Sequence, residues 1–376
     1  MTLGRRSFLK ATLAAATVSL LAGKLSLVRE AFAEVKRGNL HLVWLQGAGC
    51  SGCTVSLLNT TYPDVVDVVL GILPGAGAVS IDFHPTIMAE WGEEALKALE
   101  RAERGLLNPY ILVVEGSIQG EPPEGKGFWC LLGSETFEER FRRLASKAVA
   151  VVAVGSCASY GGIPAAKGSV TGARGCLEVL GREWASTAGL PVVNVPGCPP
   201  SGDWIVETLA HLILAYKGVL PPPELDEVNR PAFLYRFLAH EHCPRATFFA
   251  ESVFSERFGE PYCMFKLGCK GPLARCDVPE RGWINGVGGC PNSGGPCIGC
   301  TEPGFPDLFE PFTEAKLPQP LLPPRLEAAI PAARRLERPL ETPPSGFPYF
   351  SGAAFAAAAL AAAMAGLYLR KRRREG

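Results

Sequence analysis

The hydrophobic pattern of the first half of the chain alternates short apolar runs with amphipathic stretches. Five runs are typical of strands: Leu40–Leu45, Ala78–Phe83, Tyr110–Val114, Ala148–Val154 and Val192–Val195. The fourth run is apolar on both faces, as strands buried inside a parallel sheet are. Helical spacing of apolar residues marks Ile87–Arg104, Ser134–Lys147 and Asp203–Lys217, with Ser134 as a candidate N-cap. Strands alternating with helices predict an α/β fold, a doubly wound parallel sheet over about residues 38–218.

The pattern changes after about residue 225. Residues 225–310 show no strong strand period, and seven of the chain's 13 cysteines fall within the 58 residues from Cys243 to Cys300. Such a stretch cannot build a normal hydrophobic core and would need bound metal to hold its shape. We therefore expect a second, irregular domain over residues 225–310.

The N-terminus carries a pattern typical of targeting. Residues 1–33 combine Arg5-Arg6-Ser7-Phe8-Leu9-Lys10 with an uncharged stretch and the small-x-small sequence Ala31-Phe32-Ala33, which predicts a cleaved signal peptide. An ordinary secretory signal would share these features, but the paired arginines favour a twin-arginine signal, although Gly4 replaces the usual Ser or Thr. That route exports proteins already folded, as a cofactor inserted in the cytoplasm would require.

The C-terminus carries a predicted membrane anchor. Residues 350–369 are uncharged and rich in alanine, and a helix of that length spans roughly 30 Å, the thickness of a bilayer's hydrocarbon core. Consecutive cations follow in residues 370–376, which predicts a transmembrane helix with a cytoplasmic tail. A buried alanine-rich helix is the alternative, but such a helix rarely ends in a run of cations. The Pro-rich residues 311–349 are expected to be a tether, which places the body on the periplasmic side of the cell membrane.

The body between the two ends is acidic. The whole chain has 37 basic and 37 acidic residues, but residues 1–33 and 370–376 each hold five basic residues and one acidic residue. The remainder therefore has 27 basic and 35 acidic residues, a net charge of −8. A surface of this charge repels phosphate backbones, so nucleic acid is excluded as a partner.

Four cysteines follow three of the predicted strands. Cys50 and Cys53 follow the first strand, Cys157 follows the fourth and Cys198 follows the fifth. These loops all lie at the carboxyl edge of a doubly wound sheet, so the four thiols are expected to converge. Four thiolates suit either zinc or a 4Fe–4S cluster. A lone Cys-x-x-Cys could be a redox pair, and its flanking glycines resemble a phosphate loop, but the full set favours a cluster.

The second half of the chain supplies two further sets of candidate ligands. One set offers an imidazole and three thiolates: His240, Cys243, Cys263 and Cys269. The other offers four thiolates: Cys276, Cys290, Cys297 and Cys300. His242 is a rival to His240, because it is nearer to Cys243 in the sequence. Disulfides and structural zinc remain alternatives, although an odd number of cysteines is awkward for a pure disulfide framework.

Motifs in a fixed order along the chain carry a resemblance to a known family. The first half contains Gly49-Cys50-Ser51-Gly52-Cys53, Asp82-Phe83-His84-Pro85-Thr86-Ile87-Met88, Val114-Glu115-Gly116-Ser117-Ile118, Gly155-Ser156-Cys157-Ala158 and Pro196-Gly197-Cys198-Pro199-Pro200. The second half contains His240-x-x-Cys243-Pro244-Arg245, Leu267-Gly268-Cys269-Lys270-Gly271-Pro272 and Pro296-Cys297-Ile298-Gly299-Cys300. Over nearly its full length the chain resembles the small, electron-transfer subunit of a membrane-bound nickel–iron uptake hydrogenase.

This resemblance implies a flavodoxin-like first domain and three iron–sulfur clusters. A proximal 4Fe–4S cluster would be held by Cys50, Cys53, Cys157 and Cys198. A distal 4Fe–4S cluster would be held by His240, Cys243, Cys263 and Cys269. The medial site departs from the family, which commonly has a 3Fe–4S cluster there and a proline where this chain has Cys290. We therefore predict a medial 4Fe–4S cluster of lowered potential, with 3Fe–4S as the alternative, on Cys276, Cys290, Cys297 and Cys300.

The resemblance also implies that the chain has no catalytic residue of its own. A large subunit would carry the nickel–iron site that splits or forms hydrogen. Electrons would pass from it through the clusters to a membrane cytochrome b or another quinone-reducing subunit. One alternative is an iron–sulfur relay subunit of a quinone oxidoreductase, which could share the first domain only. The other is a non-redox surface protein stapled by disulfides or zinc.

A few remaining residues are assigned smaller roles. Gly52 stands where oxygen-tolerant relatives carry an extra cysteine, so the resemblance implies the standard, oxygen-sensitive type. Cys130 and Cys176 are expected to be buried structural thiols. We predict that His84 hydrogen-bonds between segments and that Glu115 caps a helix or contacts the partner. A Glu that the family often has after the first cysteine pair is absent from Thr54-Val55-Ser56, so its role does not transfer.

Overall fold

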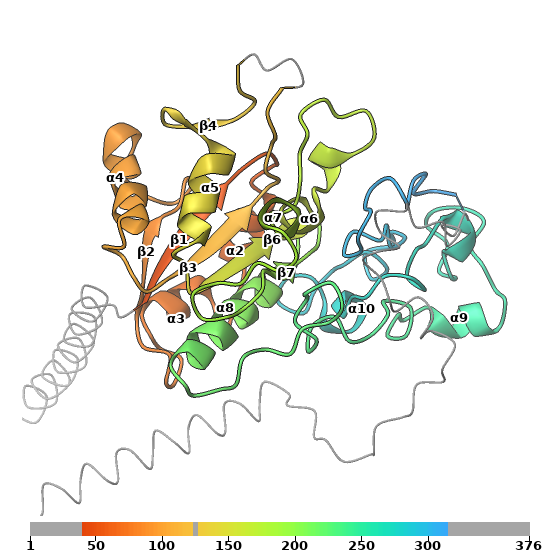
Figure 1. The fold of residues 1–376 in the computed structure, drawn as a ribbon. Coiled ribbons are helices and arrows are strands. Elements are labelled where there is room, and N and C mark those ends of the chain that lie inside the picture. Colours follow the sequence, from red (N-terminus) through yellow and green to blue (C-terminus); the bar gives the residue numbers. More distant parts are fainter. Residues whose placement is uncertain (1–39, 123–126, 315–376) are drawn as a thin grey trace, which may run out of the picture. The chain divides into compact units, whose positions relative to one another are not determined.

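The computed structural model describes residues 40–122 and 127–314 and is built around one parallel sheet (Figure 1). The strand order is β2-β1-β3-β6-β7, and every neighbouring pair is parallel. The strand bounds are β1 Leu40–Gln46, β2 Val79–Phe83, β3 Tyr110–Glu115, β6 Ala150–Val154 and β7 Val193–Val195. All five predicted strands are confirmed. β3 and β6 are buried along their whole length, which explains why the sequence of β6 is apolar on both faces.

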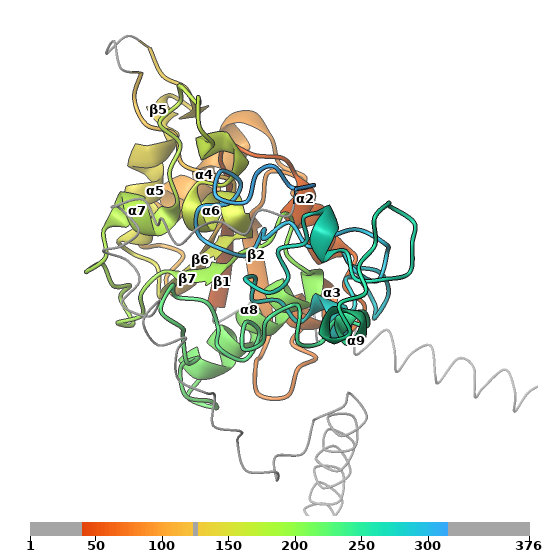
Figure 2. The ribbon, with the colours of Figure 1, turned by 90° about the vertical axis from the view of Figure 1, so that its right-hand side faces the viewer.

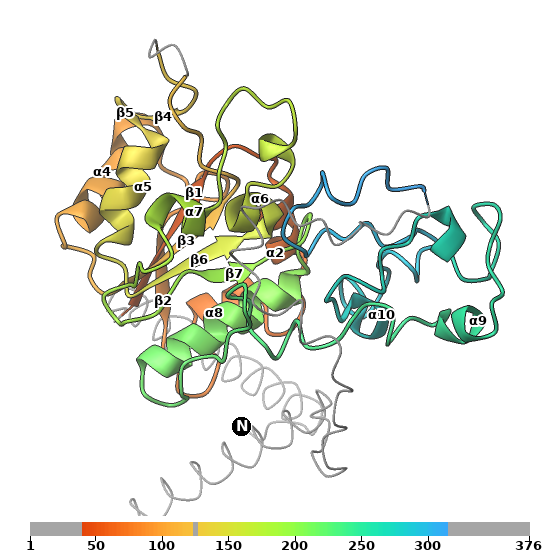
Figure 3. The same cartoon turned by 45° about the vertical axis from the view of Figure 1, so that its right-hand side comes forward.

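Helices cover both faces of the sheet, as Figure 3 shows, so the doubly wound α/β fold is confirmed. One face packs against α2 (Gly52–Leu58), α3 (Val65–Val69) and α8 (Gly202–Tyr216). The other packs against α4 (Gly92–Glu103), α5 (Phe137–Ala145) and α7 (Cys176–Leu180). The short helix α6 (Gly155–Tyr160) begins directly at the carboxyl end of β6, and η1 (Ile163–Ala165) follows it. Each face therefore buries its own hydrophobic cluster, and the carboxyl edge stays open for ligands.

Two predicted helix starts are wrong. The helix expected from Ile87 begins only at Gly92, after a turn and the extended residue Trp91. The predicted N-cap Ser134 instead lies in the tight turn between β4 (Leu131–Leu132) and β5 (Glu135–Thr136), which pair as a hairpin. The cap of α5 is Thr136, whose hydroxyl accepts from Glu139 N–H while the Glu139 carboxylate accepts from Thr136 N–H. This reciprocal capping box satisfies two N–H groups, which a cap at Ser134 would not.

Residues 219–314 contain little regular structure (Figure 2). Their helices are short: α9 Ala246–Ala250, η2 Phe265–Leu267 and α10 Val278–Arg281. Side chains of the sheet region hold this segment in place. Trp204 Nε1 of α8 donates to Asp277 Oδ1 at 2.7 Å, and Ser201 Oγ donates to the Trp283 carbonyl at 2.8 Å. The predicted boundary between two domains stays a prediction.

The predicted targeting segments lie outside the described residues. These are the signal peptide (1–33), the transmembrane helix (350–369), the basic tail (370–376) and all but the first residues of the tether (311–349). Within residues 40–122 and 127–314, no helix combines the length and the apolar character that crossing a membrane requires.

Candidate metal centres

The first four candidate ligands converge at the carboxyl edge of the sheet. Cys50 follows β1, Cys53 lies in the first turn of α2, Cys157 lies in α6 after β6, and Cys198 follows β7. Burial raises the pKa of Cys53 well above its ordinary value, and the nearby Glu115 and the other three thiolates raise it further. Burial together with Cys198 and Cys50 raises the pKa of Cys157 to about 12. Thiols that perturb one another in this way form one cluster of donors, which a bound metal centre would hold as thiolates.

Glycines bring the backbone close to these sulfur atoms. Gly155 has φ +88, and a Cβ built on it would lie 2.6 Å from Cys53 Sγ. Gly162 has φ +54, and its Cβ would lie 2.8 Å from the Cys157 nitrogen and 3.0 Å from Cys157 Sγ. A larger residue at either position would both strain the backbone and displace a ligand. The glycines therefore shape a cradle around the four thiols.

A buried polar network supports the turn that carries Cys53. Glu115 is 1% exposed, and its carboxylate accepts from Trp44 Nε1–H at 3.0 Å, from Thr54 N–H at 3.1 Å and from the Thr54 hydroxyl. Thr54 lies in the first turn of α2, so Glu115 satisfies an N–H group that has no partner within the helix. Of its two predicted roles, Glu115 is a helix cap in the structure.

His84 belongs to the same network. Its ring stacks on Trp44 with centroids 4.9 Å apart, and its Nδ1 accepts from Thr86 N–H at 3.2 Å. Its Nε2 lies 3.5 Å from Thr54 Oγ1. Burial lowers the pKa of His84 to about 4, so the ring is neutral at physiological pH. His84 thus links β2 to α2, as predicted.

The second set of thiols surrounds a cavity between α8 and α10. Cys276, Cys290, Cys297 and Cys300 all line it, together with Trp204, and it holds about 430 Å³ of partly open space. Cys290 reaches this cavity through Gly288 (φ +80) and Gly289 (φ +103). A Cβ on Gly289 would lie 2.3 Å from Val278 Cγ1, so only glycine fits there. The structure therefore brings the unexpected cysteine, Cys290, to the same cavity as the other three.

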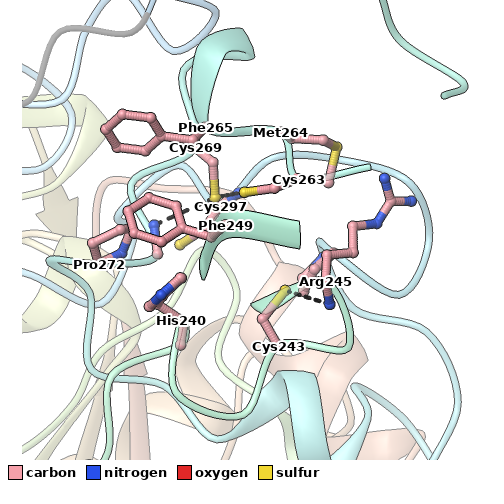
Figure 4. Close-up of a pocket in the computed structure, with 13 residues that line it drawn as sticks. His240, Cys243, Arg245, Phe249, Cys263, Met264, Phe265, Cys269, Pro272 and Cys297 are labelled. Carbon is pink, nitrogen blue, oxygen red and sulfur yellow. Dashed lines mark hydrogen bonds between the residues drawn. The ribbon is translucent and has the colours of Figure 1, made fainter. Parts of the chain in front are cut away.

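The third set surrounds a neighbouring cavity of about 420 Å³, partly open, which Figure 4 shows in close-up. In that view His240 and Cys243 lie on one side, and Cys263 and Cys269 lie on the other. Backbone N–H groups point at two of the sulfur atoms, from Arg245 to Cys243 and from Gly271 to Cys269, each at 3.4 Å. Donors of this kind stabilise thiolate and tune the potential of a cluster.

The structure favours His240 over its rival His242. His240 lines the cavity, and the edge of its ring packs on Phe249 with centroids 4.5 Å apart. His242 does not line it, and its Nδ1 lies 2.9 Å from Glu280 Oε2. His242 therefore pairs with a carboxylate outside the cavity.

The donor sets fit polynuclear clusters better than zinc or disulfides. All 13 cysteines are free thiols, so no disulfide framework is present. Zinc would need its ligands within about 2.3 Å of one ion. Among the described residues, no three His, Cys, Asp or Glu side chains converge in that way. Thiols that instead surround open cavities have the spacing that a larger iron–sulfur core requires.

The three sets adjoin in series. Ser156 precedes Cys157, and its hydroxyl donates to the carbonyl of Cys300. Cys297 N–H donates to Cys269 Sγ at 3.4 Å, which joins the second cavity to the third. Burial and Cys290 raise the pKa of Cys300 to about 12, and an N–H of Cys198 partly offsets this. Each set therefore contacts the next through its own ligands.

The two remaining cysteines lie apart from the cavities. Cys176 is fully buried in the cluster on the α4–α5 face of the sheet, and Cys130 packs against the same cluster. Burial raises the pKa of both thiols. They are structural thiols, as predicted. No sequence signal marked Ser156 as a contact between sets or marked the buried Arg230, because neither belongs to a metal-ligand spacing.

Two family models match adjoining parts of the chain. Residues 50–212 match the NADH ubiquinone oxidoreductase 20 Kd subunit family, and residues 235–313 match the C-terminal family of NiFe/NiFeSe hydrogenase small subunits. The first match covers the sheet, which both classes share. The second covers the segment that holds the medial and distal candidate ligands.

Similar proteins and structures agree with the second match. The chain is 40% identical over 290 residues to the periplasmic [NiFeSe] hydrogenase small subunit of Desulfomicrobium baculatum, covering 73% of this chain and 87% of that one. It is 35% identical over 282 residues to the quinone-reactive Ni/Fe-hydrogenase small chain of Wolinella succinogenes, covering 73% and 74%. An actinobacterial-type NiFe-hydrogenase structure from Ralstonia eutropha H16 superposes with a TM-score of 0.72 at 42% identity, covering 82% and 96%.

Proposed function

The chain belongs to the small subunits of nickel–iron hydrogenases, and we propose that it conducts electrons through three iron–sulfur clusters in series. It is the electron-transfer part of a hydrogenase, and this family carries iron–sulfur clusters and pairs with a large subunit that holds nickel and iron. The observation that carries the proposal is the serial contact of three donor sets, each around its own cavity or sheet edge. When bound, each cluster takes up and gives back one electron.

The proximal cluster would be held at the sheet edge by Cys50, Cys53, Cys157 and Cys198. The distal cluster would be held by His240, Cys243, Cys263 and Cys269. The protein's part is to provide anionic sulfur, to aim N–H groups at it and to keep water away. Phe249 and Phe265, with ring centroids 5.3 Å apart, cover the distal cavity with apolar surface.

The medial cluster would be a 4Fe–4S centre on Cys276, Cys290, Cys297 and Cys300. Support comes from Cys290, which lines the same cavity as the other three thiols and is placed there by a pair of glycines. A fourth thiolate adds negative charge and lowers the potential of that centre. The test is to purify the hydrogenase without oxygen and to compare Cys290→Pro with wild type by electron paramagnetic resonance (EPR). We expect a 3Fe–4S signal only in the variant, with Cys176→Ala as the unchanged control. A 3Fe–4S signal in anaerobic wild type would contradict a fourth thiolate ligand.

The large subunit would bind beside the proximal set. Apolar side chains of α2, α3 and the segment between them are unusually exposed there, for example Val55 (52%), Tyr62 (65%) and Val66 (52%). Exposed apolar side chains in one place are typical of an interface. At the opposite end of the relay, electrons would pass from the distal cluster to a membrane cytochrome b or another quinone-reducing subunit. The quinone-reactive relative from Wolinella succinogenes supports such an acceptor.

The targeting segments are proposed to fix the protein's location. A twin-arginine signal in residues 1–33 would export the folded protein, and a helix over residues 350–369 would anchor it with residues 370–376 in the cytoplasm. Substituting Arg5 and Arg6 by lysine should leave the protein in the cytoplasm. Removing residues 350–376 should release it into the soluble periplasmic fraction. A protein that stays bound to membranes without these residues would contradict the anchor.

The competing function is a relay subunit of a quinone oxidoreductase, which the match over residues 50–212 supports. The decisive experiment is to purify the chain anaerobically from its native membrane and to expose it to hydrogen. We expect a nickel-containing partner and reduction of all clusters, seen as bleaching of the iron–sulfur absorption. An iron-containing preparation with no nickel and no response to hydrogen would favour the quinone oxidoreductase.

A further inference from the structure

We propose that Ser156 is the positioning residue that couples the proximal donor set to the medial one and sets the rate of electron transfer between them. This inference rests on the proposed function, because it assumes clusters at both sets. Ser156 lies directly before Cys157 and is 1% exposed. It ligates nothing itself, so its role is to act through its neighbours.

The Ser156 side chain joins ligands of both sets. Its oxygen accepts from Gly197 N–H at 3.0 Å, next to the proximal ligand Cys198. Its hydroxyl donates to the carbonyl of Cys300, a medial ligand. Ser156 N–H also donates to the Gly197 carbonyl at 3.0 Å, which fixes the serine on the β7 side. One small side chain is thus hydrogen-bonded simultaneously to the backbone around Cys157, Cys198 and Cys300.

Such a link matters because electron tunnelling weakens steeply across gaps and less steeply along covalent and hydrogen-bonded paths. In this step one electron leaves the proximal centre and one enters the medial centre, with no bond made or broken and no proton moved. The serine hydroxyl shortens the path between Cys157 and Cys300 to a few bonds. A second contact, from Cys198 N–H to the Cys300 sulfur, belongs to the backbone and persists in any side-chain variant.

A neighbouring contact makes the serine testable without losing the medial ligand. The carbonyl of Thr301, the next residue after Cys300, accepts from Arg230 NH1 at 3.1 Å. The Arg230 side chain is 2% exposed and is also paired with Asp226 and Glu302. This second anchor holds the Cys300–Thr301 turn when the Ser156 hydroxyl is removed. We therefore expect Ser156→Ala to keep its iron.

Ser159 provides a matched control in the same helix. It is 4% exposed, but its hydroxyl donates to the Ala153 carbonyl at 3.2 Å and touches no ligand. Ser156→Ala and Ser159→Ala therefore remove the same group from equally buried positions of α6. Ser156→Thr keeps a hydroxyl at the first position.

The experiment uses the anaerobically purified heterodimer with oxidised clusters. It is mixed with hydrogen and frozen at intervals, and the reduced proximal and medial centres are resolved by EPR. We expect Ser156→Ala to slow medial reduction about tenfold, in the range typical for the loss of an outer-shell partner. Ser159→Ala should reduce at the wild-type rate, and Ser156→Thr should recover most of it. Iron content and hydrogen–deuterium exchange at the large subunit should be unchanged in all three.

Several outcomes would overturn this role for Ser156. Medial reduction at the wild-type rate in Ser156→Ala would do so, as would equal slowing in Ser159→Ala. If Ser156→Ala lost iron, Ser156→Thr would decide, because a fully loaded Thr variant with slow transfer contradicts coupling by the hydroxyl. A wild-type protein whose clusters hydrogen does not reduce would instead refute the proposed function itself.

Discussion

The two described regions of this chain solve the problem of folding in different ways. Residues 40–218 bury large apolar side chains in strands and helices on both faces of a sheet. Residues 219–314 contain few buried apolar side chains, such as Met264 and Phe305, and almost no regular backbone, yet they carry eight of the twelve candidate ligands. The comparison teaches that a bound cluster can take the place of a core, since ligation cross-links segments that apolar contacts do not hold.

Removing iron should separate the two regions most strongly. Without metal, the cysteines that line the medial and distal cavities would be protonated thiols around open space. We expect the amides of residues 240–300 to lose nearly all protection from hydrogen exchange, while β3 and β6 keep theirs. The measurement is hydrogen exchange with mass spectrometry on the heterodimer before and after anaerobic chelation. Equal protection of both regions in the iron-free protein would refute the distinction.

Breaking the polar tie between the regions should have the next largest effect. Arg230→Met leaves the buried carboxylates of Asp226 and Glu302 without their cation, because both pair with that guanidinium at 2.7 and 2.8 Å. Removing one partner of a buried ion pair typically costs about 3–5 kcal/mol. Urea unfolding under anaerobic conditions measures the loss.

Arg143→Met is the matched control for that substitution. Arg143 also pairs with two carboxylates, Glu103 and Glu135, but its side chain is 42% exposed on the sheet region. Exposed pairs contribute only about 0–1 kcal/mol. Equal losses in the two variants would show that the Arg230 cluster is no special link between the regions.

The contrast also explains what the sequence could predict. The strands of the sheet were predictable because runs such as Ala148–Val154 are long, apolar and periodic. The start of α5 was not, because Ser134 and Thr136 are both good caps and only the hairpin of β4 and β5 decides between them. A local sequence signal carries no information about a neighbouring strand.

The candidate site shows the same division. The grouping of the cysteines could be predicted from sheet topology in the first half, and in the second half from spacing and resemblance. Which histidine faces the distal cavity could not, because His240 and His242 differ by two positions and only the packing on Phe249 and the pairing with Glu280 separate them. Contacts such as Ser156 with Cys300 join residues 144 apart in the chain, so no spacing reveals them.

Acid should destabilise the sheet region through His84. Its pKa is about 4 in the folded protein, against about 6.5 for an unperturbed histidine, so the unfolded chain binds more protons between these values. The stabilisation is therefore complete above about pH 6.5 and is lost as pH falls toward 4, by up to about 3 kcal/mol. Unfolding free energies measured from pH 7 to 4 should show a shallower fall in His84→Gln. An identical slope in the variant would exclude His84 as the source.

The smallest expected effect tests whether the sheet region holds its proximal ligands without help from the other region. Thr54→Val removes the hydroxyl that donates to Glu115 but keeps the N–H cap of α2. A buried acceptor that loses one donor costs about 1–2 kcal/mol. Thr208→Val is the control, since Thr208 is equally buried and its hydroxyl only returns to the Trp204 carbonyl of its own helix. That bond adds little to helix stability, so the control should be nearly neutral.

Hydrogen exchange then decides where the Thr54 effect is felt. Because Glu115, Trp44 and His84 all belong to the sheet region, we expect faster exchange in α2 and the end of β3, and none in residues 240–300. A loss of protection that spread into those residues would mean that the proximal turn and the metal-dependent segment unfold as one unit. The sheet would then depend on the clusters as much as the irregular region does, and the two regions would have to be treated as a single cooperative structure.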